Sequence, residues 1–148
     1  REVTKGRKLG GPLPETSIRS SAGMNWENIR RDIAELHDSL VTIRHDLHQH
    51  PALGFEEHRT QRAVRDWLER HRPPPSTLPE TGVLADLRPD GDGATIALRA
   101  DMDALPMYEA TDLPYRSIHP GRAHKCGHDG HTTIVGQVRR DARREGNG

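Results

Sequence analysis

The sequence predicts an α/β fold of two to three helices with a β-hairpin or a partial mixed sheet. Two helical patterns precede two short apolar runs with turn residues between them, and a third helical pattern follows. The 148 residues leave room for one domain of ordinary size. Hydrophobic residues make up only 32% of the chain, whereas average domains have roughly 45–50% with glycine counted. We therefore expect a thin core with polar ends, or a piece of a larger protein.

The first helix is predicted to start at Asn25, whose side chain can cap the first turn, and to end before Pro51. Its apolar residues recur at spacings of three and four, at Ile29, Ile33, Leu36, Leu40, Ile43 and Leu47. This single stripe indicates a surface helix that packs on a core. A coiled coil has the same spacing but usually needs more heptads.

A second helix is predicted from about Glu56 or Thr60 to His71, where the prolines of residues 73–75 end it. Its inner face comprises Ala63, Val64, Trp67 and Leu68. Residues 82–87 and 95–102 are interpreted as the two strands of a hairpin, joined by the turn residues 89–93.

Residues 103–130 are interpreted as a long loop, and loops of this length are usually functional or disordered. A third helix is expected near Thr132, with Ile134, Val135 and Val138 facing inward. By domain, residues 1–23 are expected to form a disordered leader, residues 24–138 the folded part and residues 139–148 a polar, disordered tail.

Charge and composition exclude several classes of protein. Twenty-two basic residues balance 22 acidic ones, which argues against a protein built mainly to coat nucleic acid or an anionic membrane. No run approaches the roughly 20 apolar residues of a membrane span, and no secretory signal is visible. Cys126 is the only cysteine. An internal disulfide is therefore impossible, and a cytoplasmic location is expected.

The densest group of chemically active side chains lies at residues 124–131, HKCGHDGH. Three histidines, one cysteine and one aspartate in this run are potential metal ligands. Cys126 and His128 flank Gly127, so both can reach one ion from a tight loop, because a glycine lacks the Cβ that would block the approach. Thiolate and imidazole are typical ligands of zinc, cobalt or nickel. The spacing also allows a second interpretation, a surface histidine cluster with a buried cysteine.

Two acids, Asp101 and Asp103, follow the second predicted strand. Ligand sites in open α/β sheets lie beyond the carboxyl ends of strands. Strand alternation directs both carboxylates to one side, where they repel each other unless a cation lies between them or one is protonated. The alternative is a strand-exit loop with solvated acids.

Four motifs in order carry a family resemblance: RHDLHQHPALGFEEHRT (44–60), TGVLADL (81–87), RADMDALP (99–106) and HPGRAHKCGHDGHTT (119–133). Together they closely resemble the amidohydrolase branch of the zinc-peptidase family that includes aminoacylases and carboxypeptidases. Hippurate hydrolase and N-acyl-amino-acid amidohydrolases belong to this branch. The resemblance extends from about Trp26 to Gly136, and it corresponds to about the first third of a family member.

The resemblance implies the N-terminal part of a catalytic α/β domain with a two-metal site. It implies that Cys126 and His128 are metal ligands, and that the catalytic residue Asp103 orients an imidazole ligand or tunes the metals. Asp101, Asp129 and His131 are expected to surround these ligands. The implied cofactor is a divalent metal (zinc, manganese, cobalt or nickel), with two ions in a complete family site and only part of that site in this chain.

The implied activity is metal-dependent hydrolysis of the amide bond of an N-acyl amino acid. In the family, the general-base glutamate and further histidine ligands come later than Gly148, so we expect this chain to hydrolyse little or nothing alone. One alternative is a non-enzymatic remnant that binds a divalent metal or a partner chain. A partial sheet exposes edges and apolar faces, so self-association is also expected. Nucleic-acid binding through the basic ends is disfavoured because no aromatic residues interleave them.

The sequence departs from the family pattern at two places. Residues 71–80, HRPPPSTLPE, stand where the family has an apolar strand, and their prolines cannot pair in a central sheet. After Gly136 the family continues an apolar helix, whereas this chain becomes rich in arginine.

Overall fold

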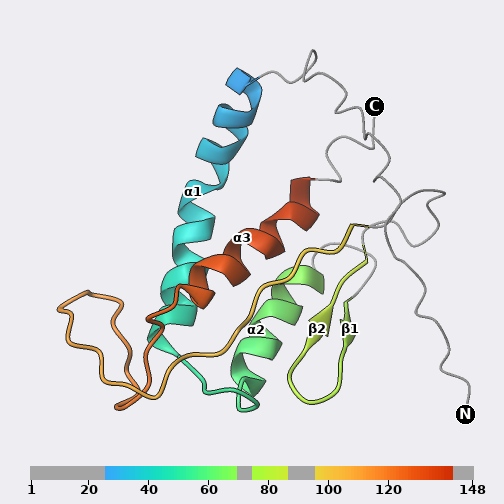
Figure 1. Cartoon of the computed structure of the whole chain (residues 1–148). Helices are drawn as coiled ribbons and strands as arrows, with labels where there is room; N and C mark the ends of the chain where they lie inside the picture. The colour runs from blue at the N-terminus through green and yellow to red at the C-terminus, as the bar shows by residue number, and fades with distance from the viewer. Residues whose placement is uncertain (1–25, 70–74, 87–95, 142–148) are drawn as a thin grey trace, which may run out of the picture.

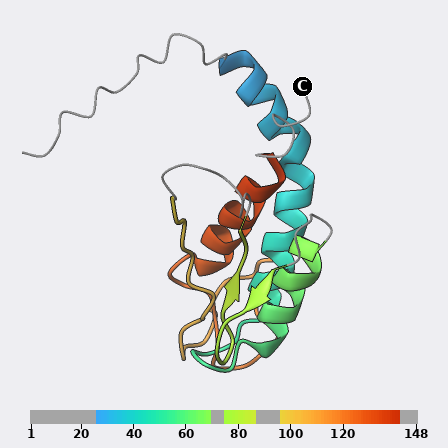
Figure 2. The same ribbon diagram turned by 90° about the vertical axis from the view of Figure 1, so that its right-hand side faces the viewer.

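A computed structural model describes residues 26–69, 75–86 and 96–141, with side chains to residue 137 (Figure 1). The described residues form α1 (Trp26–Gln49), α2 (His58–Glu69), β1 (Ser76–Thr77), β2 (Val83–Leu84) and α3 (His128–Asp141). Helix α3 packs against both α1 and α2, and the hairpin lies beside α2 (Figures 1 and 2). This arrangement confirms the predicted class, a partial α/β domain with helices and a hairpin.

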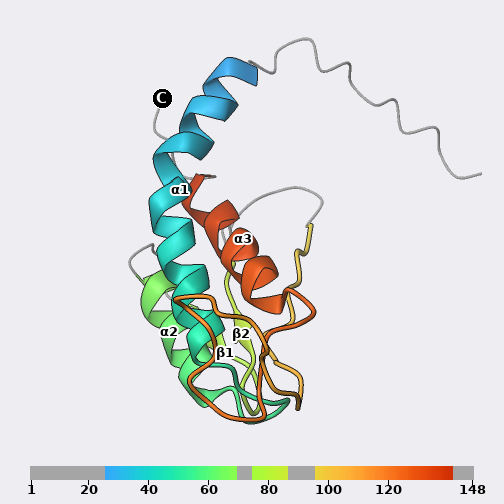
Figure 3. The same ribbon diagram turned by 90° about the vertical axis from the view of Figure 1, so that its left-hand side faces the viewer.

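Helix α1 confirms the predicted apolar stripe and its end before Pro51. Only the C-terminal part of the stripe is well covered: Leu36 and Leu47 are buried, whereas Ile33 is exposed. The first turns extend beyond α3, as Figure 3 shows. Helix α1 is therefore a surface helix that packs on the core through its C-terminal half.

Helix α2 confirms the second predicted helix and lies within its bounds, up to Glu69. Val64 and Leu68 are buried on the predicted inner face. Trp67 is half-buried, and its ring lies against the backbone of Gly136 in α3. Close packing of α2 against α3 thus depends on a position without a side chain.

The predicted hairpin has a different first strand. Strand β2 pairs antiparallel with β1, with Ser76 opposite Leu84 and Thr77 opposite Val83. The predicted pairing of residues 82–87 with 95–102 is therefore wrong for the described residues. The proline-rich segment forms a strand because the pairing involves only two residues at an edge and so needs few backbone N–H donors. The prolines lie on either side of these residues and therefore do not remove the donors.

Residues 96–102 form no strand. Ile96 and Leu98 are exposed by 85% and 57%, although the sequence predicted that both lie in the second strand of the hairpin. A strand needs a partner for its backbone groups, and no strand among the described residues pairs with residues 96–102.

Helix α3 begins four residues earlier than predicted, at His128. Ile134, predicted to face inward, is 61% exposed, while Val135 is half-buried and the side chain of Val138 lies outside the described residues. The buried face is polar instead and comprises Asp129, Thr132, Thr133 and Gln137. The prediction was wrong because it assumed that the apolar residues would mark the buried face.

The small apolar core lies where the helices meet and comprises Leu36, Leu47, Ala52, Val64, Leu68, Ala104 and Ala123. The predicted leader (1–23) lies outside the described residues, as do residues 142–148 of the predicted tail, while α3 extends to Asp141. Among the described helices, none has a stretch long and apolar enough to cross a membrane.

Candidate metal centre

The long loop before α3 is closed by an antiparallel bridge between Leu105 and Ala123. Each backbone N–H donates to the other residue's carbonyl, at 3.0 and 3.1 Å. The N–H of Ala104 also donates to the carbonyl of Ala52, at 2.7 Å, which ties the bridge to the segment after α1. These bonds bring Asp103 beside the first turn of α3.

His128, the first residue of α3, contacts Asp103 twice. Its Nδ1 lies 2.9 Å from the backbone oxygen of Asp103 and 3.0 Å from the carboxylate Oδ1. A carbonyl oxygen only accepts hydrogen bonds, so Nδ1–H donates and Nε2 is the nitrogen left to bind an ion. Histidines that ligate metals usually have such an acceptor behind the ring. Asp103 was predicted to orient an imidazole ligand or tune the metals, and orienting an imidazole requires such a contact. The role itself stays a prediction.

Cys126 is a free, exposed thiol, which excludes the interpretation that it is a buried cysteine. Gly127 has a φ of 84°, in the left-handed region that favours glycine. A Cβ added there would meet nothing within 4 Å. The backbone angle therefore explains the glycine.

The remaining predicted site residues lie in different surroundings. The carboxylate of Asp101 is half-exposed and accepts from the guanidinium of Arg99 at 2.6 and 2.9 Å. It thus pairs with a surface cation, whereas Asp103 faces His128. His131 is exposed, with its ring centroid 6.1 Å from that of His128. Asp129 is buried and faces α1.

The donor chemistry at this loop fits a divalent cation in part. Cys126 offers an accessible sulfur, and His128 offers an imidazole whose other nitrogen is already held. Within the described residues, no group of three or more His, Cys, Asp or Glu side chains is arranged to hold an ion. The loop accordingly offers two donors, and a complete coordination shell needs others.

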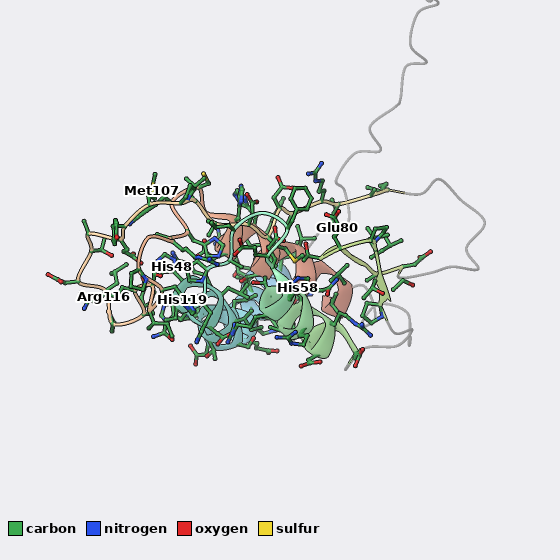
Figure 4. All side chains as sticks on the ribbon, turned by 90° about the horizontal axis from the view of Figure 1, so that it is seen from below. His48, His58, Glu80, Met107, Arg116 and His119 are labelled. Atoms are coloured by element: carbon green, nitrogen blue, oxygen red, sulfur yellow. The ribbon has the colours of Figure 1, made fainter. Side chains whose placement is uncertain are left out.

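A buried polar network lies directly behind this loop, and sequence reasoning missed its central residue, His48 (labelled in Figure 4). His48 is 4% exposed, at the end of α1. Its Nδ1 lies 2.8 Å from Oδ2 of Asp129, and its Nε2 lies 3.1 Å from Oε1 of Glu109. The Nε of Arg44 donates to the same oxygen of Asp129 at 3.1 Å. The network joins α1, the long loop and the first turn of α3.

The two carboxylates of the network are held in the ionised form. Burial opposes ionisation of Glu109, but hydrogen bonds from the Ser117 N–H, Thr111 and His48 outweigh it and lower its pKa from 4.5 to about 2. Burial also opposes ionisation of Asp129, and the bond from His48 and the positive charge of Arg44 contribute to a lowered pKa. Each ring nitrogen of His48 lies within hydrogen-bond distance of one of these two carboxylates.

The same loop is stacked against α1 on its outer side. The Tyr115 ring stacks on His45, with centroids 3.6 Å apart, and the Arg44 guanidinium lies 5.4 Å from its centre. The loop is therefore anchored to α1 by ring stacking and by the cation–π contact of Arg44.

His124 is buried beside the network, and neither ring nitrogen has a hydrogen-bond partner among the described residues. Burial lowers its pKa, against an opposing effect of the Asp129 charge. Burial thus favours the neutral form of the ring, and His124 is the one histidine of the 124–131 run that is buried.

The sequence offered one signal for His48. It directly follows Leu47, the last residue of the apolar stripe, so it lies at the edge of the buried face of α1. Its partners lie 61 and 81 positions away, and nothing in the helical spacing identifies them.

Comparison with known proteins gives consistent matches. The sequence pattern of peptidase family M20/M25/M40 matches residues 97–138. The N-acetylcysteine deacetylase of Bacillus subtilis strain 168 is 46% identical over 101 residues, which cover 67% of this chain and 27% of that protein. The hippurate hydrolase of Campylobacter jejuni is 41% identical over 109 residues, covering 73% of this chain and 28% of that protein.

A solved structure, described as a dinuclear metal-binding M20-family peptidase of Bacillus subtilis, superimposes with a TM-score of 0.64 at 41% identity. The alignment covers 72% of this chain and 32% of that one. The chain thus spans less than a third of the length of these curated relatives.

Proposed function

This chain belongs to peptidase family M20/M25/M40, and we propose that it contributes part of a metal centre that hydrolyses the amide bond of N-acyl amino acids. The observation that carries the proposal is the contact of His128 Nδ1 with Asp103, next to the exposed thiol of Cys126. The names of the relatives support the substrate class, since one deacylates N-acetylcysteine and another hydrolyses hippurate.

Cys126 and His128 would hold a divalent metal: zinc, manganese, cobalt or nickel. Bound ions of this kind acidify a water molecule and polarise the amide carbonyl. Asp103 holds the imidazole of His128 in the tautomer that presents Nε2. Asp129 faces away from the loop surface toward His48, so it supports the loop rather than contacting the substrate.

Alone, this chain is expected to turn over little substrate. Two protein donors bind an ion weakly, because zinc sites in enzymes have three protein ligands and affinity rises as the shell is completed. The activity of the family therefore depends on donors beyond these two.

A non-enzymatic role, binding a metal or a partner chain, is the second candidate. The exposed apolar side chains of Ile96, Leu98 and Leu84 favour it, because exposed apolar groups next to an unpaired backbone segment promote association. Sedimentation of the purified chain over a range of concentrations measures the association directly.

Titration with Co²⁺ tests the metal centre. A thiolate ligand gives an intense sulfur-to-cobalt absorption band, and we expect this band in the wild-type chain and its loss in Cys126→Ser. His128→Ala should weaken cobalt binding by tenfold or more, whereas His119→Ala, an exposed histidine elsewhere in the loop, should leave it unchanged. Absence of the band in the wild type would contradict the proposal.

Hippurate hydrolysis in the presence of zinc, manganese or cobalt tests the expected inactivity of the isolated chain. We expect turnover at the background level for both the wild type and Cys126→Ser. Turnover by the wild type that Cys126→Ser abolishes would show that the described residues suffice, and it would refute the need for further donors.

A further inference from the structure

The strongest unassigned feature is the buried imidazole of His48, which bonds to two carboxylates from distant parts of the chain. Glu109 comes from the long loop and Asp129 from the first turn of α3. All three side chains are at most 5% exposed. A histidine that merely fills the core needs one hydrogen-bond partner, whereas this one joins three separate segments.

Each carboxylate is fixed by other groups as well. Glu109 Oε2 accepts from the N–H of Ser117 at 2.7 Å, and Oε1 accepts from the hydroxyl of Thr111 at 2.7 Å. Asp129 also accepts from Arg44 at 3.1 Å. His48 therefore connects two carboxylates that other groups also hold, and movement of either carboxylate would break its hydrogen bond to His48.

The network reaches the candidate ligands through the backbone. Asp129 directly follows His128, and the N–H of His131 donates to the carbonyl of Gly127 at 3.0 Å, so the ligand loop is the start of the helix. The Nζ of Lys125, next to Cys126, lies 3.6 Å from Glu109 Oε1. Of the residues on the two sides of the Cys126–His128 segment, Lys125 thus lies near one carboxylate that His48 joins, and Asp129 carries the other.

We propose that His48 is a positioning residue for the metal-binding loop: it joins Glu109 to Asp129 and so holds Cys126 and His128 in place against Asp103. This inference rests on the proposed function for its metal, but the positioning can be measured without one. A replacement at His48 leaves two buried carboxylates without their shared donor. The loop and the first turn of α3 then separate, which misplaces the donors.

His48→Ala in the full 148-residue chain tests the proposal by two readouts. The first is the Co²⁺ affinity, which we expect to fall about 10- to 100-fold, the range typical of groups that support metal ligands. The second is hydrogen exchange of the His128 Nδ1 proton, measured by NMR without metal. We expect this exchange to accelerate at least tenfold, because the bond to Asp103 opens.

Thr81→Val is the matched control. The Thr81 hydroxyl donates to Glu57 at 2.6 Å, and both residues are buried, so its loss removes a buried hydrogen bond to a carboxylate between the hairpin and the segment before α2. We expect Thr81→Val to lower the thermal midpoint while leaving cobalt affinity and the exchange of the His128 proton unchanged.

Glu109→Gln serves if His48→Ala does not fold, because it keeps the shape of the side chain and weakens the same bridge. We expect a smaller change of both readouts in the same direction. If the wild type binds no Co²⁺, the proposed function fails, and the exchange measurement alone decides the role of His48. Unchanged exchange in a folded His48→Ala or Glu109→Gln variant, or an equal change in Thr81→Val, would overturn the inference.

Discussion

The end of the molecule that holds the ligand loop differs sharply from the side that carries residues 96–98. At the loop, buried polar groups are paired across long sequence distances, as in the contact of His48 with Asp129. On the other side, Ile96 and Leu98 extend into solvent without a pairing strand among the described residues. The loop end therefore pairs His48, Glu109 and Asp129 with one another, whereas the 96–98 side leaves apolar side chains exposed.

The largest expected effect concerns the packing that supports the loop end. A Cβ at Gly136 would overlap the ring of Trp67, and overpacking of this kind costs about 1–3 kcal/mol. Gly136→Ala should therefore destabilise the chain in urea denaturation, although alanine favours helices. Gly130→Ala is the control in the same helix, because its Cβ would meet nothing within 4 Å, and it should stabilise by about 0.5–1 kcal/mol. Equal effects of the two substitutions would show that α3 does not pack on α2 as described.

The second effect concerns the backbone of the ligand loop. Gly127→Ala places a Cβ in the left-handed region, which costs roughly 1–2 kcal/mol, although the space around it is free. We expect a lower thermal midpoint together with weaker Co²⁺ binding. Gly54→Ala, which has equal space and a backbone outside the left-handed region, should change neither. Full cobalt affinity in Gly127→Ala would mean that the loop angle does not set the positions of the donors.

The third effect is a pH dependence that belongs to the loop end. The pKa of Glu109 is lowered in the folded chain to about 2 from 4.5, so its stabilising contribution is complete above pH 4.5 and is lost as the pH falls toward 2. The thermal midpoint of the wild type should therefore fall more steeply over this range than that of Glu109→Gln. Glu69→Gln, an exposed carboxylate in a surface ion pair, should keep the wild-type slope. A Glu109→Gln slope equal to that of the wild type would contradict the ionised, hydrogen-bonded state of Glu109.

The same contrast explains what the sequence could predict. The α1 stripe that ends at Leu47 is a local signal, since residues three and four apart on a helix share a face whatever else is present. The pairing of β2 with Ser76 and Thr77 was missed because strand partners are chosen by the whole fold, and the adjacent prolines argued against a strand. Ile134 was assigned to the wrong face because Asp129 and its distant partner His48 determine which side of α3 is buried.

The candidate ligands were found because Cys126 and His128 are close in sequence and unusual in composition. The residues that support these ligands were not found, because the partners of His48 are brought together by the bridge between Leu105 and Ala123 in the long loop. Long-range polar contacts of this kind leave no periodic pattern in the sequence. They become visible only when the segments that carry them are brought together.

The smallest effect on stability, and the sharpest test of the 96–98 side, comes from replacing its exposed apolar residues. The double variant Ile96→Ser and Leu98→Ser removes side chains that are mostly in solvent, so the free energy of unfolding should change by less than about 0.5 kcal/mol. Self-association in sedimentation velocity should nevertheless decrease. Tyr108→Ser, which removes an exposed aromatic ring from the long loop, should leave association unchanged. If Tyr108→Ser reduces association as much as the double variant, the uncovered surface is not confined to the 96–98 side, and the contrast between the two regions fails.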